Sequence, residues 1–190
     1  MSQANNEKVV LDANVLYPAP LRDFLLNLAF LNCYVPCWTE QIQFEWMDNL
    51  LKNRKDLKNS QLKRTVKLMN EAFPHANIKN YSNLEKDLVL PDENDKHVLA
   101  AAIKSKSRII VTFNIKDFPI AILDKFKIKR FTPDDFVLML FKRNESLVLQ
   151  ALENQLKSLR NPPKTRSELL NTLKVNNLKK TIALIKKSDR

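Results

Sequence analysis

The chain contains no glycine among its 190 residues, whereas an average protein of this length has about 13. Glycine is the residue that adopts positive backbone φ angles freely and lets the backbone approach a ligand closely. The P-loop and the glycine-rich turn of dinucleotide-binding domains both depend on such positions without a Cβ. The sequence therefore excludes nucleotide-cofactor chemistry by either of these routes.

Charge is the second constraint. Hydrophobic residues make up 44% of the chain, enough for a full core, yet the formal net charge is +11. Such an excess favours a polyanionic partner, most often nucleic acid. A membrane surface is the alternative, but it would favour a terminal helix with a compact Lys/Arg face. Here the basic residues are spread along the chain, and residues 134–190 supply +6 of the +11.

Nothing in the sequence predicts export or membrane insertion. The first eight residues are polar apart from Met and Ala, and Val9–Leu11 is too short for the apolar part of a signal peptide. No apolar run approaches the roughly 20 residues that span a bilayer. We therefore expect a cytoplasmic protein with no membrane partner. Cys33 and Cys37 have no histidine nearby, so we expect two ordinary thiols rather than a zinc site or a disulfide.

Short aliphatic runs alternate with helical patterns, which predicts an α/β domain with a mostly parallel sheet. Strands are expected over four segments: Lys8–Asp12, Asn77–Asn80, Arg108–Phe113 and Lys127–Phe131. Helices are expected over Leu21–Leu31, from Thr39 to about Lys52, from about Ser60 to Phe73, and over Asn94–Lys104.

The end of the chain has a different pattern. From residue 134 onward it is helical, with a break at Asn161–Pro163, because two prolines cannot lie inside a helix. Thr165 and Glu168 have the spacing of a capping box, which predicts the start of the next helix. We therefore divide the chain into a core of residues 1–133 and an all-helical C-terminal extension of residues 134–190.

Two acidic residues of the first half stand out. Asp12 follows the aliphatic run Val9–Leu11, at the carboxyl end of a strand, where open α/β sheets place their ligand crevices. Alternatively, Asp12 and Asn14 only shape the turn after the strand. Glu45 lies at the edge of the apolar stripe of its helix, where a carboxylate is costly unless its charge is offset. The alternative is a Glu45 that reaches solvent or pairs with a lysine.

Asp95 shares a helix face with Leu99 and Ala102, which are expected to be buried, so it should point toward the sheet. The structural alternative is that Asp92 caps the helix and Asp95 stabilises its first turn, an effect of roughly 0.5–2 kcal/mol. His97 is two residues from Asp95 and is expected to point about 160° away around the helix. We therefore assign His97 no catalytic role.

Asn114 and Asp117 follow the expected strand Arg108–Phe113, where they could also cap a short helix. Taken together, the candidates follow two strands and lie on two helices that face the sheet. Like charges 4 Å apart cost about 4 kcal/mol at an effective dielectric of 20. A hard divalent cation would remove this repulsion, and Mg²⁺ or Mn²⁺ prefers oxygen ligands. The pattern therefore indicates a site for Mg²⁺ or Mn²⁺.

Four segments carry a family resemblance. They are LDANVLY, the glutamate of QFEW, PDENDKHVLAAAI and VTFNIKDFP. In order and rough spacing they resemble the PIN domain over about residues 8–133, and most of all its longer VapC-like members, toxins of bacterial toxin–antitoxin pairs that carry a helical tail. The resemblance implies a PIN-like three-layer α/β/α sandwich with a central parallel sheet.

The resemblance also implies a site. Asp12, Glu45 and Asp95 would be three of the family's acidic residues. Many PIN domains have aspartate where Asn114 stands, whereas VapC-like chains often have asparagine followed by aspartate three residues later. Either Asp117 is the fourth acid, or Asn114 contacts a metal-bound water. One metal and two metals both remain open.

The implied activity is Mg²⁺- or Mn²⁺-dependent cleavage of RNA. A cation held mainly by Asp12 and Asp95 would lower the pKa of a bound water, with Thr112 as an orienting residue. Glu45 would position that water, take its proton or hold a second ion. We expect single-stranded or loop RNA as substrate, because its backbone is accessible, and steep salt dependence. The residues expected to contact RNA are basic: Lys52, Arg54, Lys55, Lys96 and Lys116.

Among partners, the resemblance implies a cognate antitoxin protein and, as is common in the family, self-association. Two alternatives to a toxin ribonuclease stand beside it. One is a PIN-fold nuclease that acts in RNA maturation or on DNA without an antitoxin. The other is a catalytically silent RNA-binding module whose carboxylates are helix caps.

Overall fold

Four parallel strands form the centre of the protein, in the order β2-β1-β3-β4. β1 (Lys8–Leu11) pairs with β2 (Val35–Cys37) on one side and with β3 (Ile109–Val111) on the other, and β4 (Lys129–Phe131) pairs with β3. This computed structural model describes residues 7–188. The predicted α/β class and the parallel sheet are confirmed.

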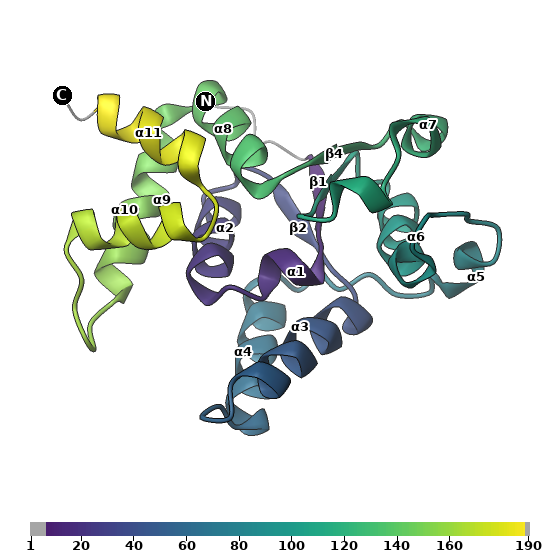
Figure 1. Cartoon of the computed structure of the whole chain (residues 1–190), viewed down its shortest axis with the longest axis horizontal. Coiled ribbons are helices and arrows are strands. Elements are labelled where there is room, and N and C mark those ends of the chain that lie inside the picture. The colour runs from purple at the N-terminus through teal and green to yellow at the C-terminus, as the bar shows by residue number, and fades with distance from the viewer. Residues whose placement is uncertain (1–6, 189–190) are drawn as a thin grey trace.

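Helices cover both faces of the sheet, which makes three layers. Figure 1 shows α2 (Ala19–Phe30) and α8 (Pro133–Arg143) on one side of the strands and α6 (Lys96–Ser105) on the other. α6 contacts β1, β2 and β3, whereas α2 contacts β2 and α8 contacts β4. The predicted sandwich is therefore confirmed.

The remaining helical segments surround these layers. They are α1 (Ala13–Leu16), α3 (Glu40–Asn53), α4 (Asn59–Ala72), α5 (Ser82–Glu85), α7 (Ile120–Leu123), α9 (Glu145–Ser158), α10 (Arg166–Val175) and α11 (Lys179–Ser188), with the 3-10 turns η1 (Glu93–Asp95), η2 (Ile115–Asp117) and η3 (Asp124–Phe126). No helix within residues 7–188 is long and apolar enough to cross a membrane.

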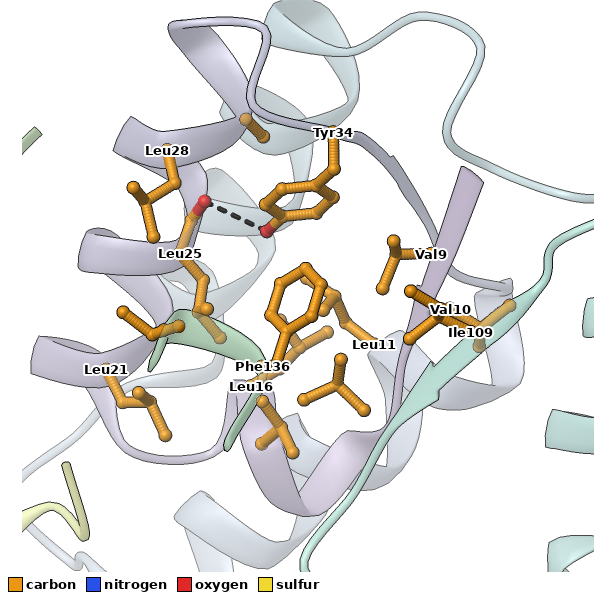
Figure 2. Packing of buried hydrophobic residues seen from close by; sticks show 14 of the residues in the cluster. Val9, Val10, Leu11, Leu16, Leu21, Leu25, Leu28, Tyr34, Ile109 and Phe136 are labelled. Atoms are coloured by element: carbon orange, nitrogen blue, oxygen red, sulfur yellow. Dashed lines mark hydrogen bonds between the residues drawn. The ribbon is translucent and has the colours of Figure 1, made fainter. Parts of the chain in front are cut away.

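The core between α2, α8 and the sheet is built from aliphatic and aromatic side chains. Figure 2 shows Leu25 of α2 and Phe136 of α8 facing Val9 and Leu11 of β1. Tyr34 packs edge-on against Phe136 with ring centroids 5.0 Å apart, and its hydroxyl donates to the Leu25 carbonyl at 2.9 Å. Because the buried hydroxyl has an acceptor, the ring adds apolar contact without an unsatisfied polar atom.

One strand prediction was wrong. Asn77–Asn80 is not a strand: Asn77 makes only an isolated bridge with Trp38. The fourth strand is instead Val35–Cys37, whose central residue is Pro36. Proline donates no ladder hydrogen bond and weakens any strand pattern, but it is tolerated in an edge strand, and β2 is at the edge of this sheet.

The positions where other proteins use glycine are occupied by other residues. Positive φ angles occur at Asn32, Asn80, Lys106, Lys127 and Asn177 within the described residues. Asparagine tolerates this conformation better than most residues, and lysine pays roughly 1–2 kcal/mol for it. Lys106, with φ 60°, ends α6 where a glycine is usual.

Polar side chains order the helices of the C-terminal extension, and one of them, Gln155, joins the extension to the core. The Asp134 carboxylate accepts hydrogen bonds from the backbone N–H groups of Lys180 at 2.8 Å and Thr181 at 2.9 Å, and so fixes the start of α11. The Gln155 amide of α9 donates to the Pro20 carbonyl of α2 at 2.9 Å. The predicted capping box is present: the backbone N–H of Thr165 donates to the carboxylate of Glu168 at 2.7 Å.

Candidate active site

Asp12 lies where β1 ends and α1 begins, and its carboxylate is held from three sides. One oxygen, Oδ1, accepts from the Ala13 N–H at 2.6 Å. The other, Oδ2, accepts from the Thr112 hydroxyl at 2.6 Å and from the Asn14 amide at 2.7 Å. The residue is 3% exposed. Burial raises the pKa of Asp12, and the hydrogen bonds from Thr112 and Ala13 oppose this rise.

The same network joins the carboxyl ends of the two central strands. Asn14 Oδ1 accepts from the Phe113 N–H at 3.1 Å, and Asn14 Nδ2 lies 3.2 Å from the Thr112 hydroxyl. That hydroxyl also accepts from the Asn114 N–H at 2.9 Å. Asp12 and Asn14 therefore shape the turn after β1, which was the structural alternative for these two residues. The Asp12 carboxylate also lines a cleft.

Asp95 occupies the junction between η1 and α6 and is half-buried. Its side chain makes no capping hydrogen bond, whereas Asp92 caps the turn by accepting from the Asn94 N–H at 2.9 Å. Within the part of the chain that is described, Asp95 Oδ2 is buried without any hydrogen-bond partner. Burial, followed by the charges of Asp12, Asp92 and Asp117, raises the pKa of Asp95 to about 7.

Glu45 reaches the cleft from α3 and meets His97. The Nε2 atom of His97 lies 3.0 Å from Glu45 Oε1, and His97 is 1% exposed. Its other nitrogen, Nδ1, is buried with no partner among residues 7–188. The sequence predicted only that His97 points away from Asp95 around the helix; it did not predict the contact with Glu45, because Glu45 belongs to a different helix.

α3 is held in place by a buried arginine. The Arg22 guanidinium lies 4.5 Å from the centre of the Trp46 ring and donates to the Leu16 carbonyl at 2.8 Å. A guanidinium over an indole face is a favourable cation–π contact. Because Arg22 belongs to α2, this contact ties α1, α2 and α3 together and fixes the helix that carries Glu45.

The loop after β3 is held by Arg130 of β4, whose guanidinium donates to the carbonyls of Ile115 and Phe118. This loop carries Asn114, which is exposed, and Asp117, which is partly buried. The Asp117 N–H donates to the Asn114 carbonyl at 3.1 Å. Asp117 contributes negative charge near Asp95.

The candidates are gathered around one cleft of about 320 Å³. Its lining consists of Asp12, Ala13, Asn14, Tyr17, Glu45, Asn49, Asn53, Asp95 and Asn114. Three of the four predicted acids and Asn114 therefore face a common space, and Asp117 stands outside its lining. No three His, Cys, Asp or Glu side chains of the described residues are close enough to form a complete ligand cluster by themselves.

The donor set of the cleft fits a hard divalent cation. Asp12, Glu45 and Asp95 present carboxylate oxygens and Asn114 presents an amide oxygen, which are the ligand types that Mg²⁺ and Mn²⁺ prefer. Mg²⁺ keeps several waters, so a few protein ligands suffice. The buried Asp95 Oδ2 without a partner is the atom whose environment a cation would improve most.

None of the residues predicted to contact RNA lines the cleft. Lys52 pairs with Asp48 at 2.6 Å and Lys96 with Glu93 at 2.7 Å. Arg54 also has an acidic partner, and Lys55 and Lys116 are exposed, without an ion pair to the described residues. Asn14 was predicted from the sequence only as a turn residue, and Tyr17, Asn49 and Asn53, which also line the cleft, were not predicted.

Comparison with known families agrees with this geometry. Residues 8–116 match the family model described as PIN domain, and residues 133–187 match the one described as VapC50 C-terminal domain. Because the first match covers more than half of the chain, the protein belongs to the PIN-domain family. The expected resemblance to VapC-like members with a C-terminal extension is confirmed.

A curated relative adds detail. The Mycobacterium tuberculosis (strain ATCC 25618 / H37Rv) protein named "Putative ribonuclease VapC50" is 37% identical over 79 residues, which are 42% of this chain. The match spans 47% of that relative, so about half of its length is covered. No solved structure matches the chain.

The raised pKa of Asp95 predicts a pH-dependent penalty in the metal-free protein. The ordinary pKa is 3.8 and the folded-state pKa is about 7, so the folded state keeps a proton that the unfolded state has lost between these values. Stability should therefore fall as pH rises through this window. We predict that Asp95→Asn, which removes the charge, is more stable than wild type in EDTA at pH 8, with a smaller difference at pH 5.

Urea unfolding at both pH values measures this difference. The control is Asp87→Asn, because Asp87 is exposed and outside the cleft; it should shift stability equally at pH 5 and pH 8. A lower stability of Asp95→Asn than wild type at pH 8 would mean that the carboxylate stabilises the helix start, as the capping alternative holds.

Proposed function

We propose that the protein is an endoribonuclease that hydrolyses RNA phosphodiester bonds with Mg²⁺ or Mn²⁺. The observation that carries the proposal is the buried, partnerless Oδ2 of Asp95, in a cleft shared with the Asp12 carboxylate. A buried carboxylate oxygen without a partner lowers the stability of the folded state, so this arrangement indicates a functional role. PIN-family membership and the ribonuclease name of the relative support the same reading.

The chain's own residues have distinct tasks in this proposal. Asp12 and Asp95 hold the cation, which when bound would activate water and offset the charge that develops on the phosphate. Thr112 orients Asp12 through its 2.6 Å hydrogen bond. Glu45 positions the attacking water, takes up its proton or holds a second ion. Asp117 or Asn114 completes the site, with Asp117 supplying charge and Asn114 facing the cleft.

RNA affinity in this proposal comes from the basic surface. The five lysine and arginine positions proposed as RNA contacts are Lys52, Arg54, Lys55, Lys96 and Lys116. Three of them already hold carboxylates, so Lys55 and Lys116 are the better placed for phosphate. Overall, a net charge of +11 favours a polyanion even though the cleft itself is acidic.

The proposed biological role is that of the toxin in a type II toxin–antitoxin pair, acting in the cytoplasm with a cognate antitoxin protein and as a homodimer. It is supported by the two VapC50 matches, of which one covers the C-terminal helices. We also propose the division into a nuclease domain, residues 1–133, and a helical extension, residues 134–190. The extension packs on α2 and shares its core.

Incubation of purified protein with total cellular RNA tests the activity. We predict cleavage with Mg²⁺ or Mn²⁺ that stops in EDTA, because the carboxylates alone cannot activate water. Asp95→Asn should cut at least about 100-fold more slowly, since a metal ligand is lost, while Asp87→Asn should cut like wild type. Intact RNA binding without cleavage in either metal would contradict the proposal and leave a silent RNA-binding module.

A second prediction concerns His97, which holds Glu45. His97→Gln retains an N–H donor of similar reach, whereas His97→Phe fills the space and leaves Glu45 with the exposed Gln41 amide, 3.2 Å from its Oε1, as the remaining partner. Because loss of a group that orients a ligand typically costs 10–100-fold in metal affinity, we predict Mn²⁺ affinity reduced roughly 10-fold in His97→Phe and nearly retained in His97→Gln. Calorimetric titration measures this, with thermal unfolding to confirm folding of both variants. Equal affinities of the two variants would contradict a positioning role.

A further inference from the structure

Beyond Glu45, the cleft is lined by side chains that have no part in the proposed metal chemistry. Glu45, Asn49 and Asn53 are spaced four residues apart on α3, so they share one helix face, and all three line the cleft. Tyr17, at the end of α1, lines it too. α1 packs against α3 (Figure 1), so this row runs from the acidic end of the cleft to a neutral end.

The neutral end is built from two amides and one phenol ring. Asn53 Nδ2 lies 3.4 Å from the Tyr17 hydroxyl. Asn49 makes no side-chain hydrogen bond within residues 7–188, so its donor and acceptor are both available. Tyr17 is partly buried against the core, which holds its ring at the cleft wall. None of the lysines or arginines described lines the cleft.

This chemistry suits a nucleobase and not a phosphate. Amide side chains offer both a donor and an acceptor, as base edges require, and bases stack on aromatic rings whatever their identity. A phosphate would instead be bound by cationic groups. The cleft volume of about 320 Å³ lies at the lower end of the range for ligand pockets, which fits a single nucleotide rather than a longer stretch.

We infer that Tyr17, Asn49 and Asn53 form a subsite for one unpaired nucleotide beside the bond to be cut. The base stacks on Tyr17 while the two amides contact its hydrogen-bonding edge. A paired base cannot occupy the subsite, because its edge is engaged by the complementary strand. The position of the subsite beside the cleaved bond rests on the proposed ribonuclease function. Such a subsite would make the enzyme selective for single-stranded RNA with a preferred base.

Binding measurements in EDTA test the subsite without cleavage. Fluorescein-labelled RNA octamers of each of the four bases are compared with an abasic ribose-phosphate octamer by fluorescence anisotropy. We expect wild type to bind at least one base-bearing octamer roughly 10-fold more tightly than the abasic one, in line with stacking on a single ring. Asn49→Ala/Asn53→Ala and Tyr17→Leu should each lower that preference at least about 3-fold and leave abasic binding unchanged.

Matched variants separate recognition from structure. Tyr17→Phe keeps the ring and should keep most of the preference, and Asn171→Ala, an exposed amide on α10, should change nothing. Asn49 and Asn53 are exposed, so their replacement leaves the fold intact even if Tyr17→Leu disturbs it. Equal losses on abasic and base-bearing octamers, or no loss on either, would overturn the subsite.

The cleavage assay distinguishes this failure from failure of the ribonuclease function. Metal-dependent cutting together with base-independent binding would overturn the subsite and leave the nuclease standing. Base-dependent binding that the variants abolish, without any cutting in Mg²⁺ or Mn²⁺, would support the subsite as a nucleotide-binding site and overturn only the nuclease.

Discussion

The hydrogen bond from the Thr112 hydroxyl to Asp12 joins the carboxyl ends of β3 and β1, and the geometry of the cleft depends on it. The same hydroxyl accepts from the Asn114 N–H. The buried Thr112 side chain therefore positions both Asp12, which follows β1, and the loop that follows β3. Asn14 closes the network between them. Because parallel strands end at a common edge, Asp12 and Thr112 meet in space although they are 100 positions apart in the chain.

Around this network the cleft concentrates negative charge that the protein does not fully neutralise. Asp95 is half-buried beside Asp12, Asp92 and Asp117, which raises its pKa, and His97 offsets only part of that effect. The molecule as a whole carries the opposite sign, with a net charge of +11. An acidic cleft in a basic protein is the arrangement expected where a bound cation promotes a reaction of a polyanion. The unneutralised charge lowers the stability of the folded protein, a common trade-off at active sites.

Local patterns predicted those features that depend on local interactions. Thr165 caps α10 as expected, and Thr39, where a helix was expected to begin, caps α3; both are local contacts between residues three positions apart. The edge strand Val35–Cys37 was missed because Pro36 hides it, and its position depends on pairing with β1. The contact between His97 and Glu45 could not be predicted from one helix, since it joins α6 to α3. The neutral end of the cleft could not be predicted from the sequence, because Asn49 and Asn53 belong to α3 whereas Tyr17 lies at the end of α1.

The proposed chemistry depends on a divalent cation that Asp12 and Asp95 bind in the cleft at the end of β1 and β3. Crystals of the protein soaked in Mn²⁺, with diffraction recorded at the manganese absorption edge, test it most directly. We expect an anomalous peak in the cleft with oxygens of Asp12 and Asp95 at roughly 2.0–2.3 Å, typical of such cations, and no peak in Asp95→Asn crystals. Manganese bound elsewhere, or an undiminished peak in the variant, would contradict it.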